Sequence, residues 1–204
     1  STGYFNVGIG FSTVNGALVR TGVTENNFRG LGQRLGLDVA VSQKSQDFDV
    51  SFTEPYFLGR RLRAGIDVFH SRQDYQDESS YDSQVTGGRL RTGWNYTDDF
   101  SQQVRYTLKQ DEITDVGDEA SKYIKEEKGK YTNSSIGTTF VYDKRDSAMF
   151  TKNGYFLSLG SDVAGLGGDE KYVKFDSKAY WYKTFADYYT FKLFANAGMI
   201  EGYG

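Results

Sequence analysis

The sequence predicts an all-β fold, an antiparallel up-and-down β-barrel of the kind that crosses a membrane with strands rather than helices. Three observations predict it: apolar and polar residues alternate with a period of two, the alternating segments are long, and aromatic residues gather beside alternate turns. Most of the segments are longer than the roughly 5–6 residues typical of soluble sheets. A tilted strand of about 9–11 residues is long enough to cross a bilayer.

About eleven segments alternate in this way, and none shows a 3.6-residue period with helix caps. The first is typical, because Phe5, Val7, Ile9 and Phe11 alternate with small or polar residues. The stretch 119–127 is the nearest to a helical pattern, but its charge predicts a loop. The expected strands span residues 3–13, 17–26, 34–43, 46–54, 60–72, 83–97, 101–114, 131–143, 154–164, 171–185 and 188–200.

The two ends of the expected strands differ in their connections. Short turns are expected at residues 58–60, 97–99 and 186–187, each flanked by aromatic residues, whereas the connections at 71–82 and 115–131 are long and polar. Outer-membrane barrels have this asymmetry, with an aromatic girdle at the membrane interface. The flanking aromatic residues are Tyr56, Phe57, Trp94, Tyr96, Phe100, Tyr180, Trp181, Tyr182, Phe185, Tyr188 and Tyr189.

The composition excludes several classes of function. The 204 residues include 24 Lys+Arg and 27 Asp+Glu, a net charge of −3, which argues against a nucleic-acid partner held by phosphate contacts. No cysteine is present, and the one histidine, His70, is expected to be solvated at a strand end. The acidic residues of the long loops could bind Ca²⁺ or bridge lipopolysaccharide, but they lack the spacing of an EF-hand. We therefore predict no enzyme, no cofactor and no metal site.

Three stretches carry a resemblance to a known family. Residues 25–32, 51–57 and 142–154 resemble the N-F-x-G-x-G, D/E-P-Y-F and D-x-R-D…T-x-G motifs of BamA-type outer-membrane assembly proteins, in the same order and spacing. One departure is Phe150, where the family has proline before Thr151. The residues that carry the motifs are Phe28, Gly30, Gly32, Pro55, Tyr56, Phe57, Asp143, Arg145, Asp146 and Gly154.

The resemblance implies a domain organisation and a location. Members of the family have periplasmic POTRA domains ahead of a sixteen-stranded barrel in the bacterial outer membrane. Residues 1–204 are therefore expected to be a partial barrel, about eleven of the sixteen strands. The POTRA domains and the C-terminal barrel strands are expected to be absent from this chain.

The resemblance also implies a function: folding and inserting other β-barrel proteins without ATP, with the first barrel strand as a templating edge. In that strand the apolar residues would face lipid, and Asn6, Gly8 and Gly10 the lumen. The implied partners are unfolded outer-membrane proteins, lipid and lipopolysaccharide, and assembly lipoproteins that bind mainly through the absent POTRA domains. The residues expected to pair with a client strand are Asn6, Val7, Gly8, Ile9, Gly10 and Phe11.

Other functions fit parts of the pattern. A polypeptide-secreting transporter of the same superfamily would share the motifs, and a passive diffusion porin would share the alternating strands. Periodicity alone also allows a soluble β-sandwich that binds a ligand, because its inward faces are apolar in the same way.

Overall fold

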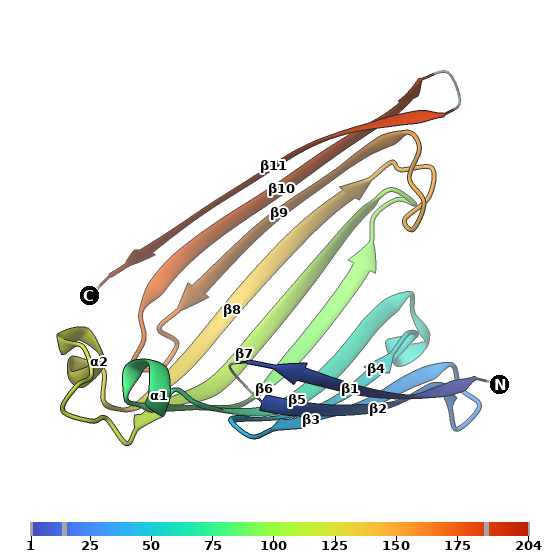
Figure 1. The fold of residues 1–204 in the computed structure, drawn as a ribbon. Coiled ribbons are helices and arrows are strands. Elements are labelled where there is room, and N and C mark those ends of the chain that lie inside the picture. The colour runs from blue at the N-terminus through green and yellow to red at the C-terminus, as the bar shows by residue number, and fades with distance from the viewer. Residues whose placement is uncertain (1, 14–15, 186–187, 204) are drawn as a thin grey trace.

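The computed structural model describes residues 2–13, 16–185 and 188–203, and these form one 11-stranded antiparallel sheet in which the strands follow in sequence order (Figure 1). The all-β up-and-down prediction is confirmed, and the strand ends differ from the predicted ones by no more than two residues. The turn predicted at 186–187 lies outside the described residues. The strands are β1 (Gly3–Ser12), β2 (Gly16–Phe28), β3 (Gln33–Ser42), β4 (Ser45–Glu54), β5 (Leu62–Asp74), β6 (Asp82–Asn95), β7 (Phe100–Thr114), β8 (Gly129–Asp143), β9 (Gly154–Ala164), β10 (Tyr172–Phe185) and β11 (Tyr189–Gly202).

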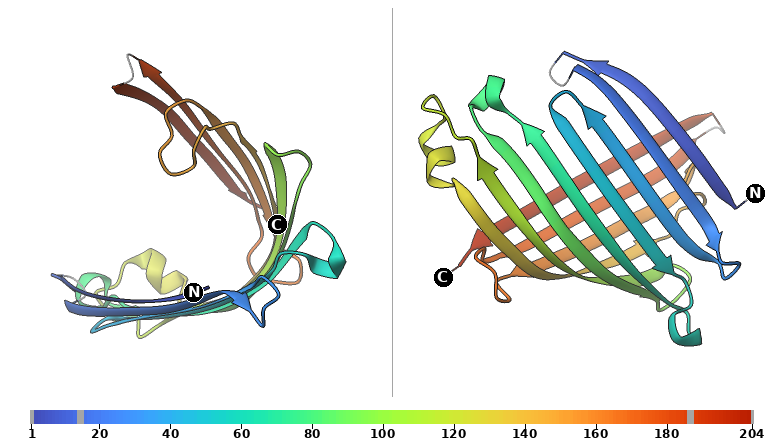
Figure 2. Two further views of the ribbon diagram at one scale, coloured as in Figure 1. Left: turned by 90° about the vertical axis from the view of Figure 1, so that its right-hand side faces the viewer. Right: turned by 90° about the horizontal axis from the view of Figure 1, so that it is seen from below.

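The sheet is strongly curved but open. Figure 2 shows a concave and a convex face, with β1 and β11 at two separate edges. Within the described part of the chain, β1 pairs only with β2, and β11 pairs only with β10. The curvature is that of a barrel wall whose two edges do not meet here.

The apolar side chains lie on the convex face and have little to pack against. Ile9 is 84% exposed and Phe11 is 80% exposed. Each of the strands β2 to β11 also has at least one exposed large apolar residue. The only buried apolar residues among those described are Ala40, Ala120 and Ala164. A soluble sandwich would bury this face between two sheets, so that alternative is wrong. The convex face instead suits a bilayer.

Within the described connections there are three short helical turns, which the sequence did not predict. They are η1 (Phe57–Gly59), α1 (Gln76–Ser79) and α2 (Lys122–Glu126). α2 lies inside the stretch 119–127 that was expected to be a loop. It begins where the Ser121 hydroxyl accepts a hydrogen bond from the Ile124 amide at 3.3 Å, which is an N-cap. None of the described helices is long and apolar enough to cross a membrane.

His70 differs from its predicted environment. β5 continues beyond it to Asp74, so His70 lies within the strand and is half-buried rather than solvated at the strand end. Its Nδ1 atom is 2.7 Å from the hydroxyl of Thr86, and its ring lies beside that of Phe48.

Aromatic rings line the convex face at the short-turn ends of β6 to β9. The rings of Tyr96 and Phe100 stack at 5.2 Å, and those of Tyr142 and Tyr155 lie 5.8 Å apart. This part of the predicted girdle is confirmed. Tyr180 and Tyr182 do not belong to it, because they alternate with Trp181 and point to the concave face, where the ammonium of Lys192 lies over both rings. In the sequence, Tyr180, Trp181 and Tyr182 are consecutive, so they were all assigned to the girdle although successive residues of a strand point to opposite faces.

Polar side chains bridge neighbouring strands on the concave face, above glycines. The guanidinium of Arg105 in β7 reaches over Gly137 in β8 and donates to Asp162 in β9 at 2.6 Å. A Cβ at Gly137 would overlap with the Asp162 carboxylate. Arg91 in β6 similarly crosses Gly65 in β5 to reach Thr53 in β4. Glycine in these strands therefore makes room for ties across three strands.

Candidate functional site: the edge of the first strand and the short-turn motifs

Between Tyr4 and Phe11, the outer edge of β1 has no partner strand among the described residues. Its ten residues pair in unbroken register with β2 from Gly3 opposite Glu25 to Ser12 opposite Gly16. Since a strand pairs through its backbone on both sides, the other side of β1 is available for a further strand. This is the stretch that contains the predicted pairing residues.

No packing contact among the described residues requires the two glycines inside β1. A Cβ added to Gly8 or Gly10 would meet nothing within 4 Å. Gly22 in β2 is different, because a Cβ there would come within 2.6 Å of the Asp38 carboxylate and 2.9 Å of the Asn6 amide oxygen. Gly8 and Gly10 therefore reduce the stability of the middle of β1, because glycine has no side chain to pack and disfavours a strand interior.

The faces of β1 follow from its register. Asn6 lies opposite Gly22 and close to Asp38, which puts its side chain on the concave, polar face with Gly8 and Gly10. Val7 and Ile9 therefore point to the convex, apolar face, as do Phe5 and Phe11. The Thr21 hydroxyl of β2 donates a hydrogen bond to the backbone carbonyl of Asn6 in β1 at 3.4 Å.

The first motif forms the turn between β2 and β3. The Asn27 side chain closes this turn by accepting a hydrogen bond from the Gly32 amide at 2.7 Å. Arg29, Gly30 and Gly32 all have positive φ, and glycine adopts such a conformation without steric cost. Phe28 begins the turn at a register shift in the β2–β3 ladder. The motif thus specifies a backbone shape.

The second motif forms the turn between β4 and β5. Glu54 accepts a hydrogen bond from the Tyr56 amide at 2.9 Å, and Phe57 opens the 3₁₀ turn η1. Leu58 has a φ of 56°, which is unusual for a residue with a side chain. A Cβ at Gly32 would lie 4.0 Å from the Pro55 ring, so the first and second motifs are neighbours at the same rim.

The third motif forms the long turn between β8 and β9. Arg145 donates two hydrogen bonds to the Asp143 carboxylate, at 2.8 and 2.7 Å. The Asp146 carboxylate accepts from the amides of Lys152 and Asn153, both at 3.0 Å, and these bonds hold the pKa of Asp146 below its usual value.

Gly154 closes this turn with a φ of 115°, and a Cβ there would overlap with the Lys144 carbonyl oxygen. The carboxylates of the third motif are thus engaged in holding the turn. They are not arranged as an acid–base pair.

The structure therefore separates the predicted site residues into two groups. The motif residues lie in turns at one rim, whereas Asn6 to Phe11 run along the edge strand. Two asparagines inside the motif stretches have structural roles that the predicted site residues did not include: Asn27, described above, and Asn153, whose side chain accepts a hydrogen bond from the Thr184 amide of β10 at 3.2 Å. An asparagine next to a turn is the sequence signal that could have indicated them.

Together the curved sheet, the apolar convex face and the polar concave face define a transmembrane β-barrel protein of the outer-membrane class. A model of the Omp85 superfamily domain matches residues 27–204, so the chain belongs to the Omp85 superfamily. The match begins after β1.

Proteins of other organisms match most or all of this chain in sequence. The chain is 26% identical over 203 residues to the outer membrane protein assembly factor BamA of Neorickettsia risticii, covering 99% of this chain and 28% of that protein. It is 24% identical over 221 residues to BamA of Neisseria meningitidis serogroup B, covering 100% of this chain and 28% of that protein. A SAM50-like protein of Drosophila melanogaster is 27% identical over 174 residues, covering 78% and 37%. The chain thus spans little more than a quarter of the length of the BamA relatives.

Solved structures agree on the fold. BamA from Haemophilus ducreyi lacking POTRA domains 1–3 superposes with a TM-score of 0.82 at 19% identity, over 100% of this chain and 42% of that chain. CdiB from Acinetobacter baumannii superposes less well, with a TM-score of 0.54 at 14% identity, over 97% and 39%. The fold and the bacterial relatives place the chain in the bacterial outer membrane.

Proposed function

We propose that this chain is part of an outer-membrane protein assembly factor, and that the edge of β1 templates the strands of client barrels without ATP. The relatives named above as assembly factors support the first part. The observation that carries the second part is the outer edge of residues 4–11, which has no partner strand among the described residues and contains two glycines with open space above them.

The physical reason is backbone hydrogen bonding. A client strand that enters the bilayer must satisfy each N–H and C=O group, because an unpaired group in hydrocarbon costs several kcal/mol. Pairing with an existing edge satisfies these groups one residue at a time. The free energy of pairing and of apolar burial can then drive insertion, so the step needs no nucleotide and no covalent chemistry.

The domain organisation is part of the proposal. Further barrel strands outside this chain would continue the sheet beyond β11, and the last of sixteen would meet β1 at a weak seam. POTRA domains, also outside this chain, would recruit assembly lipoproteins. The convex face would contact lipid, and the long polar connections would contact lipopolysaccharide at the outer surface.

Site-specific crosslinking tests the templating role. In the full-length protein, we would place single cysteines at Gly8, Ile9 and Gly10, and a second set along the last strand of a client barrel stalled during assembly. The expected result is a ladder of disulfides in antiparallel register. Gly88→Cys in β6 is the matched control, because a Cβ there meets only the Asp67 carbonyl, at 3.5 Å, and β6 is paired on both sides.

Two outcomes would overturn the proposal. Crosslinks that form as readily at Gly88 as at Gly8 would mean that the client does not select the edge strand. An absence of crosslinks, together with a large and steady ion conductance of the intact barrel in planar bilayers, would favour a passive pore.

A further inference from the structure

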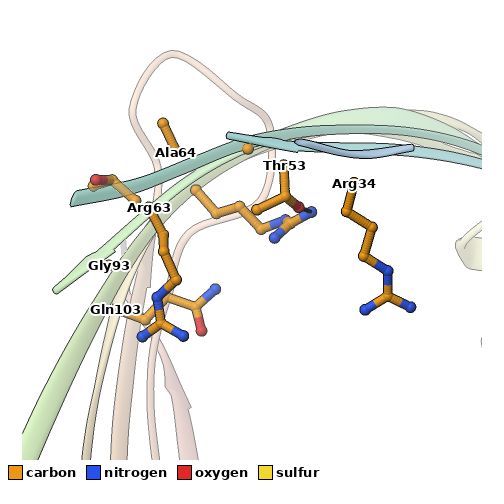
Figure 3. Close-up of a pocket in the computed structure, with 9 residues that line it drawn as sticks. Arg34, Thr53, Arg63, Ala64, Gly93 and Gln103 are labelled. Carbon is orange, nitrogen blue, oxygen red and sulfur yellow. Dashed lines mark hydrogen bonds between the residues drawn. The ribbon is translucent and has the colours of Figure 1, made fainter. Parts of the chain in front are cut away.

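A positively charged hollow lies on the concave face near the short-turn ends of β3 to β7. Its volume is about 290 Å³, and its polar lining residues are Arg34, Thr53, Arg63, Arg91, Thr92 and Gln103. Figure 3 shows Arg34, Arg63 and Gln103 projecting from the same side of the sheet into the space beneath it. No carboxylate belongs to the lining residues.

Only one of the three arginines is neutralised. Arg91 donates to both oxygens of the Asp67 carboxylate at 2.9 Å, and to the Thr53 hydroxyl at 2.8 Å. Within the described part of the chain, no carboxylate pairs with Arg34, and Arg63 has only a 3.3 Å hydrogen bond to the Asn95 amide oxygen.

The nearest acidic residue along β4 is Glu54, and its oxygens are occupied by the Gln33 side chain and the Tyr56 amide. It alternates with Thr53 and so lies on the other face. Two exposed guanidinium groups thus remain uncompensated in the hollow.

Two of the neighbouring turns add positive charge, whereas the β6–β7 turn carries Asp98 and Asp99. Arg29 lies in the β2–β3 turn, and Arg60 and Arg61 lie in the β4–β5 turn at the same rim. At the opposite rim, Asp77 and Glu78 are both paired with Lys44. A basic corner at one mouth of the curved wall raises the local concentration of acidic ligands.

The chemistry and the geometry select the class of ligand. Guanidinium groups bind carboxylates and phosphates through paired hydrogen bonds. Arg34 lies opposite Thr53 and Thr53 opposite Gly65, so Arg34 and Arg63 stand two strands apart and two residues out of register. At the usual spacings this separates their backbones by about 11–12 Å, so a small anion between them cannot form paired bonds to both without distortion. An extended peptide with carboxylates on alternate residues spaces them by about 7 Å and can engage both. A lipid headgroup is disfavoured, because bilayer lipid lies against the convex face.

We propose that this hollow binds an acidic polypeptide segment at the short-turn mouth of the barrel, through Arg34 and Arg63. The proposal does not depend on strand pairing at β1, and the two can fail separately. Arg91 also lines the hollow, but its guanidinium is already paired with Asp67.

Peptide binding to the full-length protein tests the proposal. The probe is a fluorescent peptide of alternating glutamate and serine, and its partner has glutamine in place of glutamate. The protein is held in nanodiscs of phosphatidylcholine, and binding is read as fluorescence anisotropy. Arg34→Gln and Arg63→Gln are each expected to weaken binding of the glutamate peptide about tenfold, the factor for one charge-assisted hydrogen bond.

Arg20→Gln is the matched control. Arg20 is also an exposed arginine of the concave face, but it borders a different hollow that contains Asp38, Asp47 and Asp49. This variant should bind the glutamate peptide nearly as well as the parent protein. Arg34→Lys should recover part of the affinity by restoring the charge, and heat-modifiable gel mobility reports that each variant is folded.

Several results would overturn the proposal. Equal binding of the glutamine peptide, or an equal loss in Arg20→Gln, would mean that the hollow has no selectivity for acidic segments. Saturable binding of inorganic phosphate to the hollow without binding of the peptide would identify a small-anion site. Loss of peptide binding when phosphatidylglycerol is added to the nanodisc would identify a lipid headgroup as the occupant.

Discussion

β1 and β7 follow the same alternation of apolar and polar residues, but they are held in the sheet in different ways. β1 has ten residues, one neighbouring strand among those described, and open space above Gly8 and Gly10. β7 has fifteen residues and two neighbours, and its Arg105 side chain reaches two strands away to Asp162. The described contacts are therefore denser at the centre of the sheet than at β1, and under the proposed function β1 is the strand that exchanges partners.

The largest effect is expected in the turn that closes the central strands. Gly154→Ala should destabilise the fold strongly, because a φ of 115° costs a residue with a side chain about 1–3 kcal/mol and the new Cβ also overlaps with the Lys144 carbonyl. Heat-modifiable gel mobility would measure the loss. Gly8→Ala is the control in the edge strand, and equal destabilisation by both would remove the contrast between the two regions.

A somewhat smaller effect should follow when the central tie is cut. Arg105→Met leaves the Asp162 carboxylate, whose side chain is 16% exposed, without its partner, at a cost of about 1.5–3 kcal/mol. Asp162→Asn in the same background should recover part of this, and the double-mutant cycle in urea isolates the pair. If the two single changes are simply additive, the bridge does not hold the strands together.

Stiffening the edge should act in the opposite direction. Gly8→Ala and Gly10→Ala should each stabilise β1 by about 0.5–1 kcal/mol, because alanine disfavours a strand less than glycine and fits without contact. Under the proposed function, the tighter edge should also slow the assembly of client barrels by purified protein in liposomes. A stabilised β1 with unchanged assembly would separate the strand from the activity.

The smallest expected effect is the acid response of the β8–β9 turn. The amides of Lys152 and Asn153 lower the pKa of Asp146, so its contribution to stability is complete above the ordinary aspartate pKa, near 3.9. It is lost as the pH falls through the lowered value in the folded state. Asp146→Asn should therefore flatten the decline in stability below about pH 4. Near neutral pH, the stability of this variant should depend only weakly on pH. An unchanged acid profile would exclude this role.

The sequence predicted the elements of the sheet better than the ties between them. Alternation ends where turns begin, so the strand ends could be placed to within two residues. The short helix α2 has only five residues, too few for a helical period to show. The partnership of Arg105 with Asp162 spans 57 positions and depends on the register of three strands, which a single sequence does not encode locally. The positive φ of Leu58 is likewise imposed by the turn.

The free edge of β1 was predicted through the family resemblance, and the structure adds the open space above its glycines. Composition and periodicity contain no signal for that space, because it depends on which side chains lie opposite in β2. The basic hollow was not predicted for the same reason: Arg34 and Arg63 lie far apart in the sequence and meet only through the pairing of β3, β4 and β5.

Hydrogen–deuterium exchange of the full-length protein in nanodiscs tests the central claim most directly. The amides of β1 and β7 would be compared with and without a peptide corresponding to the last strand of a client barrel. We predict that β1 exchanges much faster than β7, and that the peptide slows exchange in β1 while leaving β7 unchanged. Exchange in β1 as slow as that in β7, or unaffected by the peptide, would contradict a templating edge.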